Sequence, residues 1–339
     1  MAVIFNKQIV FYIVAPPYTT QSAGIRVLHL LCHLINTHGG SAFILYEPKV
    51  LPKAANKYLN SKLSTTLLST FDLKKHKRLS LKIIVIYPEI IWGNPYHSSR
   101  VARYLLNFPG LLKGPSYYKM TDFVFSYSES INNSYPESQG QLFIPTLNTE
   151  NFWFTGNEKR EFTCYYAAKH KSLGGQPIGL PEGCVEITRG KGSLSQQQVG
   201  DLLRRSKCIY IFENTHLIYE AVMCGCPVVI KFNEHFKELI GNEHFSLNGI
   251  TFSDSEKDLR IAYEKIPEAL KGYQQLEEIT LSQLKVFSQK IERFKFEDDK
   301  TSFYHPFYSP IRLFYVGFYI LPINIWIKAV RFVKKIFQL

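Results

Sequence analysis

The chain has 339 residues, of which 45% are hydrophobic, 14% aromatic and 20% charged. A composition this rich in apolar residues excludes disorder for the bulk of the chain, and a length of this size, at roughly 100–200 residues per domain, predicts two domains. The formal net charge of +12 indicates an anionic partner, which is a nucleic acid, a membrane surface or a phosphorylated small molecule.

The first half of the chain alternates apolar runs with helical patterns. Strands are predicted at Gln8–Ala15, Ala42–Tyr46, Ile83–Tyr87, Asp122–Tyr127 and Gln141–Ile144. Helices are predicted over 25–35, which ends before Gly39-Gly40, and over His97–Asn107. The apolar N-terminus predicts a first strand rather than a signal peptide. Such alternation is typical of a parallel sheet with helices on both faces.

A second series of elements follows residue 156. Strands are predicted at Phe162–Ala167, Cys184–Thr188, Cys208–Phe212 and Cys226–Lys231. Helices are predicted over Ser195–Ser206, with Ser195 as the N-cap, over Asn214–Met223, which ends at Cys224-Gly225, and through most of 254–293. We therefore expect domains at 1–155 and 156–300, followed by a basic tail at 301–339.

The stretch Ile209–Ile230 carries the most chemistry. A buried strand leads to Glu213-Asn214-Thr215, then to a helix that contains Glu220, and then to a second buried strand. Ligands of open α/β sheets bind at the carboxyl ends of the strands. A helix N-terminus near Asn214 and Thr215 offers backbone N–H groups to a phosphate, and Glu220 is suited to accept hydrogen bonds from ribose hydroxyls.

This stretch resembles the signature of the GT-B glycosyltransferases, especially the family-4-like group. The matching residues are Glu213, Glu220-Ala221 and Gly225-Cys226-Pro227-Val228-Val229. The resemblance implies two Rossmann-like domains whose parallel sheets face a cleft, with the nucleotide-sugar donor on the second domain and no metal. It assigns Glu220 to the ribose and Glu213 to catalysis beside the donor sugar. The two glutamates lie seven positions apart, one fewer than is common in the family, which weakens the role of Glu213 in particular.

Three further positions fit the resemblance. Gly24 follows the first strand, where the family carries a glycine loop that approaches the donor or acceptor. Lys169, with Lys171 as second choice, follows the strand that opens the second domain, where a cation neutralises the donor diphosphate. Arg189 follows Val185–Thr188 and faces the same cleft. Each of these cations also fits a solvated surface position.

Glu89 and His97 follow the strand Ile83–Tyr87, on the acceptor side of such a cleft. Either one could be the base that an inverting enzyme uses to deprotonate an acceptor hydroxyl, and we choose Glu89. The alternative is that Glu89 caps a helix and His97 is exposed. A retaining enzyme needs no such base.

The positive charge is concentrated in two places. The stretch Lys49–Lys82, which we expect to be rich in loops, holds nine Lys or Arg residues and one acid, Asp72. The tail 301–339 holds five Lys or Arg residues and no acid, with apolar and basic residues on opposite sides of its last helical segment. This arrangement is typical of an interfacial helix on anionic lipid, and the alternative is a helix that packs on the first domain.

The sequence thus predicts a cytoplasmic Leloir glycosyltransferase that is peripheral at the inner face of the cell membrane. The expected partners are a nucleotide-diphospho-sugar and a glycan or lipid-linked acceptor of cell-surface polysaccharide synthesis, and no nucleic acid. Six cysteines in mostly apolar runs are expected to be buried free thiols. A catalytically silent GT-B protein that binds a nucleotide or glycan for another transferase is the alternative function.

Overall fold

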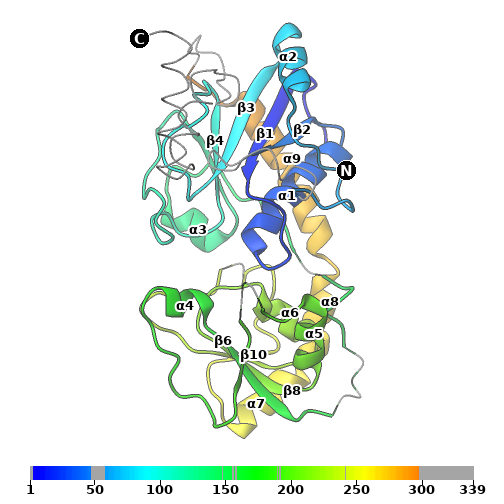
Figure 1. Cartoon of the computed structure of the whole chain (residues 1–339), viewed down its shortest axis with the longest axis vertical. Coiled ribbons are helices and arrows are strands. Elements are labelled where there is room, and N and C mark those ends of the chain that lie inside the picture. The colour runs from blue at the N-terminus through cyan, green and yellow to red at the C-terminus, as the bar shows by residue number, and fades with distance from the viewer. Residues whose placement is uncertain are drawn as a thin grey trace, which may run out of the picture.

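The structure, a computed structural model, describes residues 3–46, 58–146, 148–154, 156, 159–188, 190, 192–240 and 242–297. Its strands form two five-stranded sheets, and all strand pairings within these ranges are parallel. Figure 1 shows one sheet in each half of the molecule. The predicted α/β class with two Rossmann-like units is confirmed.

The first sheet has the strand order β2-β1-β3-β4-β5. Its strands are β1 (Ile9–Ala15), β2 (Ala42–Tyr46), β3 (Lys82–Pro88), β4 (Val101–Leu105) and β5 (Phe123–Ser126). The short helix α3 (Glu129–Ser134) follows β5, and the Ser128 side chain caps it by accepting a hydrogen bond from the Ile131 N–H.

Both faces of the first sheet are covered, so β1 is buried along its whole length. Phe11 and Leu31 lie in one core cluster with Phe287, so α1 (Ala23–Thr37) and α9 (Leu276–Arg293) pack on one face. Tyr12 lies in the other cluster with Leu73 of α2 (Thr70–Arg78). This is why β1 has apolar side chains at successive positions rather than at alternate ones.

Helix α9 returns from the second half of the chain to the first sheet (Figure 1). The Phe287 ring centroid lies 4.7 Å from that of Phe125 and 6.2 Å from that of Phe11. The predicted domain boundary between residues 155 and 156 assigns α9 to the second domain. In the structure, however, the apolar face of α9 packs in the core of the first domain.

The second sheet has the order β10-β9-β8-β6-β7. Its strands are β6 (Phe162–Tyr166), β7 (Val185–Glu186), β8 (Ser206–Ile211), β9 (Val228–Ile230) and β10 (Ile250–Thr251). Its helices are α4 (Ala168–Ser172), α5 (Gln196–Arg204), α6 (Leu217–Met223), α7 (Glu256–Glu264) and α8 (Ile266–Tyr273). As predicted, Ser195 caps α5 by accepting from the Gln198 N–H, and Gly225, at φ +69°, follows the end of α6.

The helix predicted over His97–Asn107 is wrong, because this segment contains the strand β4. Its run Val101-Ala102-Arg103-Tyr104-Leu105 is buried throughout, and the Arg103 Nε donates to Asp122 Oδ2 at 2.8 Å. This ion pair compensates the charge of Arg103 within the buried strand. The strand predicted at Gln141–Ile144 is also wrong, since Gln141 makes only an isolated bridge with Ser126.

The basic stretch Lys49–Lys82 is only partly loop, because it contains α2, and residues 49–57 lie outside the described ranges. The predicted amphipathic tail, 301–339, also lies outside them. Within the described ranges no helix is both long enough and apolar enough to cross a membrane. The six cysteines are free thiols, and five of them are buried.

Candidate functional site

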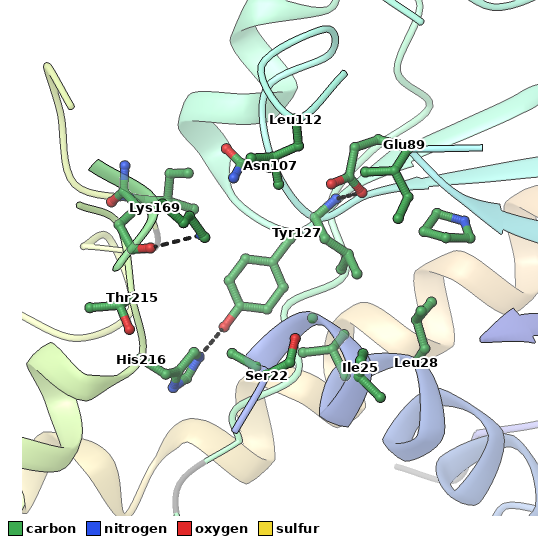
Figure 2. A pocket seen from close by; sticks show the side chains of 18 of the residues that line it. Ser22, Ile25, Leu28, Glu89, Asn107, Leu112, Tyr127, Lys169, Thr215 and His216 are labelled. Atoms are coloured by element: carbon green, nitrogen blue, oxygen red, sulfur yellow. Dashed lines mark hydrogen bonds between the residues drawn. The ribbon is translucent and has the colours of Figure 1, made fainter. Parts of the chain in front are cut away.

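The carboxyl ends of strands from both sheets meet at one cavity. Glu89 follows β3 in the first sheet, and Lys169 and Thr215 follow β6 and β8 in the second. The cavity that they line has a volume of about 210 Å³ (Figure 2). Two Rossmann-like sheets therefore face each other across a cleft. This is the predicted GT-B arrangement.

Glu89 is a buried carboxyl group on the first-domain side of this cavity, 5% exposed. Its Oε2 accepts a hydrogen bond from the Leu106 N–H at 3.1 Å. Burial raises the pKa of Glu89 to about 7, although the Leu106 amide and the charge of Lys169 oppose that rise. A carboxyl group with this pKa is half protonated near neutral pH, which suits a general base or acid.

The backbone around Glu89 is packed closely against Gly114. A Cβ atom on Gly114 would lie 2.5 Å from the Glu89 carbonyl oxygen and 2.7 Å from Ile90 Cα, so only glycine fits there. The Tyr118 hydroxyl donates to the same carbonyl oxygen at 3.1 Å. These contacts hold the backbone of Glu89 in place at the end of β3, beside the cavity.

Lys169, Asn214 and Thr215 lie together on the second-domain side. The Lys169 Nζ donates to the Asn214 carbonyl oxygen at 3.2 Å, which holds the ammonium group beside the cavity. The Asn214 side chain binds the neighbouring loop, since its amide donates to the Glu238 carbonyl oxygen and its oxygen accepts from the Ile240 N–H, each at 2.9 Å. The structure thus brings together three predicted residues. The Asn214 side chain binds the neighbouring loop, and its carbonyl oxygen holds Lys169.

Glu220 lies on α6 and forms an ion pair with Arg26 of α1. The Arg26 Nη1 lies 2.9 Å from Glu220 Oε1 and 2.8 Å from the Thr146 carbonyl oxygen, and both side chains are almost completely buried. Both residues line a second, smaller cavity of about 60 Å³, which also has Thr215 and His216 in its wall. The predicted ribose ligand is therefore engaged by a cation that the sequence analysis did not select.

A second contact joins the domains at the wall between the two cavities. The Tyr127 hydroxyl lies 2.8 Å from His216 Nε2, and the two side chains meet at the centre of Figure 2. His216 is buried, and this burial, aided by the charge of Arg26, lowers the pKa of the His216 imidazole to about 3. The ring is consequently neutral at physiological pH, and its Nδ1 makes no hydrogen bond within the described part of the chain.

Glu213 caps α4 instead of lining either cavity. Its Oε2 accepts hydrogen bonds from the backbone N–H of Lys169 and, at 3.1 Å, from that of His170. A carboxylate at a helix N-terminus is stabilised by these N–H groups. The contacts of Glu213 hold Lys169 at the cleft, and its predicted catalytic role stays a prediction.

The remaining predicted residues are placed as follows. Gly24 lines the larger cavity, and a Cβ atom there would lie 3.5 Å from Leu106 Cδ1, which is an ordinary contact. His97 is exposed and lines neither of the two cavities. Lys171 is exposed and pairs with Glu186 at 2.7 Å. Arg189 lies outside the described residues.

Arg26, Tyr127 and His216 are the cleft residues that sequence reasoning missed. Arg26 follows Gly24 by two positions and His216 follows Thr215, so proximity to selected residues was the available signal. Tyr127 gave no signal, because it directly follows the buried strand β5 and looked like one more aromatic core residue.

No model of a known protein family matches the chain, and no curated protein matches it. Among solved structures, the glycosyltransferase SnogD from Streptomyces nogalater is 12% identical, with a TM-score of 0.42 over 84% of this chain and 100% of that chain. An alpha-glucosyltransferase in complex with UDP and a 13-mer DNA is 12% identical, with a TM-score of 0.42 over 91% and 98% of the two chains. T4 phage BGT in complex with its UDP-glucose substrate is 11% identical, with a TM-score of 0.40 over 84% and 97%.

Proposed function

We propose that this protein is a Leloir glycosyltransferase that moves a sugar from a nucleotide-diphospho-sugar to an acceptor hydroxyl. One observation carries the proposal. A buried carboxyl group with a pKa near 7, that of Glu89, faces the Lys169 ammonium group across the cavity between the two sheets. A base on one side and a cation on the other are what inverting transfer away from a diphosphate leaving group requires.

On the donor side, the Arg26–Glu220 pair separates when the donor binds. Glu220 then accepts hydrogen bonds from the ribose hydroxyls, and Arg26 turns to the phosphates together with Lys169 and the Thr215 hydroxyl. A nucleoside diphosphate offers both a diol and an anion, so it can replace each partner of the ion pair. Arg189 remains a proposed further cation for the diphosphate.

On the acceptor side, Glu89 removes the proton from the acceptor hydroxyl. The acceptor oxygen forms a bond to the anomeric carbon of the sugar as the bond from that carbon to the diphosphate oxygen breaks. The proton ends on Glu89, and the negative charge that develops on the leaving diphosphate is neutralised by Lys169 and Arg26. Attack from the face opposite the leaving group inverts the anomeric carbon, which NMR of the product tests directly.

The reaction is proposed to need no metal, since cations of the chain meet the diphosphate. The acceptor is a glycan or lipid-linked molecule of cell-surface polysaccharide synthesis. Activity that persists in excess EDTA supports metal independence, and activity that returns only with Mg²⁺ or Mn²⁺ rejects it.

We also propose that the tail 301–339 holds the protein on the inner face of the cell membrane, in the cytoplasm. The basic and apolar sides of its last segment support this localisation. The test is flotation with vesicles containing phosphatidylglycerol, comparing the full chain with a truncation before Ile311. Equal flotation of the two proteins rejects the proposal.

The transferase proposal is tested with a panel of UDP-, GDP-, dTDP- and CMP-sugars in a thermal-shift assay, followed by product analysis. Stabilisation by one donor class and its turnover in the presence of an acceptor support the proposal. Binding without turnover favours a catalytically silent nucleotide-binding partner of another transferase, and the absence of both rejects each function.

A further inference from the structure

The two sides of the larger cavity differ in chemistry. The second-domain side presents the polar groups of Lys169, Thr215 and His216, next to the apolar side chains of Ile218 and Ile240. The first-domain side is mostly apolar, and Figure 2 shows Ile25 and Leu28 of α1 below the cavity and Leu112 above it. Other apolar residues complete this side: Pro16, Ala23, Val27, Pro88, Ile90 and Leu106.

The apolar side carries few polar side chains. The Tyr127 hydroxyl is bound to His216, and the Asn107 side-chain oxygen accepts from the Phe108 N–H at 2.9 Å. Ser22 adds a hydroxyl group just before α1, and Glu89 is the carboxyl group on this side within the described part of the chain. An acceptor seated here therefore meets one carboxyl base in a wall that is otherwise mostly apolar.

A sugar is poorly matched to such a wall. Each hydroxyl that is buried without a hydrogen-bond partner costs about 1–3 kcal/mol, and a sugar ring carries several. An apolar body instead gains about 25 cal/mol for each Å² removed from water. The cavity, of about 210 Å³, has room for the reacting end of an acceptor.

We propose that the acceptor is an alcohol or phenol whose reactive hydroxyl is carried by an apolar body, which packs between Ile25, Leu28 and Leu112 while the hydroxyl meets Glu89. This inference rests on the proposed transferase function and replaces the glycan proposed there as acceptor with a molecule that has an apolar body. The bonds that form and break are those of the transfer described above.

The test compares one phenol, 4-methylumbelliferone, with one disaccharide, maltose. UDP-, GDP- and dTDP-glucose serve in parallel as donors, and product is measured by mass spectrometry. We expect transfer to the phenol with kcat/KM at least tenfold above that for maltose. Equal or better use of maltose overturns the inference while leaving the transferase proposal standing.

A matched pair of variants tests the wall itself. Leu112 lines the cavity, whereas its half-buried neighbour Leu111 does not. Leu112→Gln should raise the KM for the phenol at least tenfold and leave donor affinity unchanged, and Leu111→Gln should leave both unchanged. Equal effects of the two substitutions overturn the inference.

Binding of 4-methylumbelliferone, followed by its fluorescence anisotropy, gives a readout that needs no turnover. Weaker binding to Leu112→Gln than to Leu111→Gln supports the apolar seat even where no tested sugar is transferred. Equal binding to both variants overturns it. A failure of all donors in the thermal-shift panel, by contrast, counts against the transferase function alone.

Discussion

Arg26 Nη1 lies 2.9 Å from Glu220 Oε1, in a buried ion pair that joins α1 of the first sheet to α6 of the second. The two residues are 194 positions apart in the chain. This pair couples the ribose ligand proposed for the donor to the helix that forms the floor of the acceptor side.

The first prediction concerns the stability that this pair confers. Removal of one partner leaves a buried charge unpaired, so Arg26→Met and Glu220→Leu should each lower the free energy of unfolding by about 3–5 kcal/mol. The double variant should lose much less than the sum of the two, because neither charge remains. Urea unfolding in a double-mutant cycle measures the coupling, and additive losses would contradict it.

The second prediction concerns the phosphate role of Lys169. Lys169→Met should weaken the binding of UDP at least tenfold, because it removes a cation beside the diphosphate, and should leave the binding of uridine nearly unchanged. Calorimetry measures both affinities. Lys171→Met is the matched control, since Lys171 is exposed and paired with Glu186. Equal losses for UDP and uridine would assign Lys169 to folding of the site instead.

The third prediction concerns the activity carried by Glu89. Because its carboxylate must be ionised to act as a base, kcat should rise with pH through a value near 7. Glu89→Gln should lower kcat by about 10²–10⁴-fold while donor affinity is retained. A pH profile that stays flat from 5 to 8 in the wild-type protein would remove Glu89 from this role.

The raised pKa of Glu89 also predicts how the free energy of unfolding depends on pH. The pKa of Glu89 is raised by folding from its ordinary 4.5 to about 7, so the folded protein binds the extra proton between these values. Its contribution to stability is present below 4.5 and is lost as pH rises through 7, by about 3 kcal/mol in total. Glu89→Gln should therefore equal the wild type at pH 4.5 and exceed it at pH 8 in urea unfolding.

The fourth prediction concerns His216, for which the free energy of unfolding should depend on pH in the opposite direction. Folding lowers the pKa of its imidazole from 6.5 to about 3, so the unfolded chain binds a proton that the folded protein excludes. Stability should fall on acidification from pH 6.5 toward 3, by up to about 1.4 kcal/mol per pH unit. His216→Phe should lose this slope relative to the wild type. His97→Asn, at an exposed histidine, should keep it, and a slope retained by both would exclude His216 as its source.

The fifth prediction separates folding from ligand approach at Gly24. A methyl group fits there against Leu106, so Gly24→Ala should fold with unchanged or slightly increased stability. If the substrate lies against this backbone, kcat/KM should nonetheless fall at least tenfold. Gly272→Ala in α8, where a Cβ atom meets nothing within 4 Å, is the control and should keep full activity. Equal activity of both variants would place the substrate away from Gly24.

Much of the site follows from one pattern that is visible in the sequence. Glu89, Lys169 and Thr215 each come just after a buried strand in the sequence, and the carboxyl ends of parallel strands share one edge. The diphosphate role of Lys169 was implied by the family resemblance. The strand β4 escaped this reasoning because Arg103 interrupts its apolar run, and only the partner Asp122 makes a buried arginine acceptable there.

The sequence by itself determined the alternation of strands and helices, and hence two parallel sheets with polar groups at their carboxyl edges. Only the tertiary structure decided how those edges work together. It paired Glu220 with Arg26 and joined His216 to Tyr127. It also placed the Glu213 carboxylate at the N-terminus of α4 and buried Glu89, which raises the pKa of Glu89 to about 7. The physical reason is that local patterns report which face of an element is apolar, whereas charge partners and desolvation depend on residues brought together from distant parts of the chain.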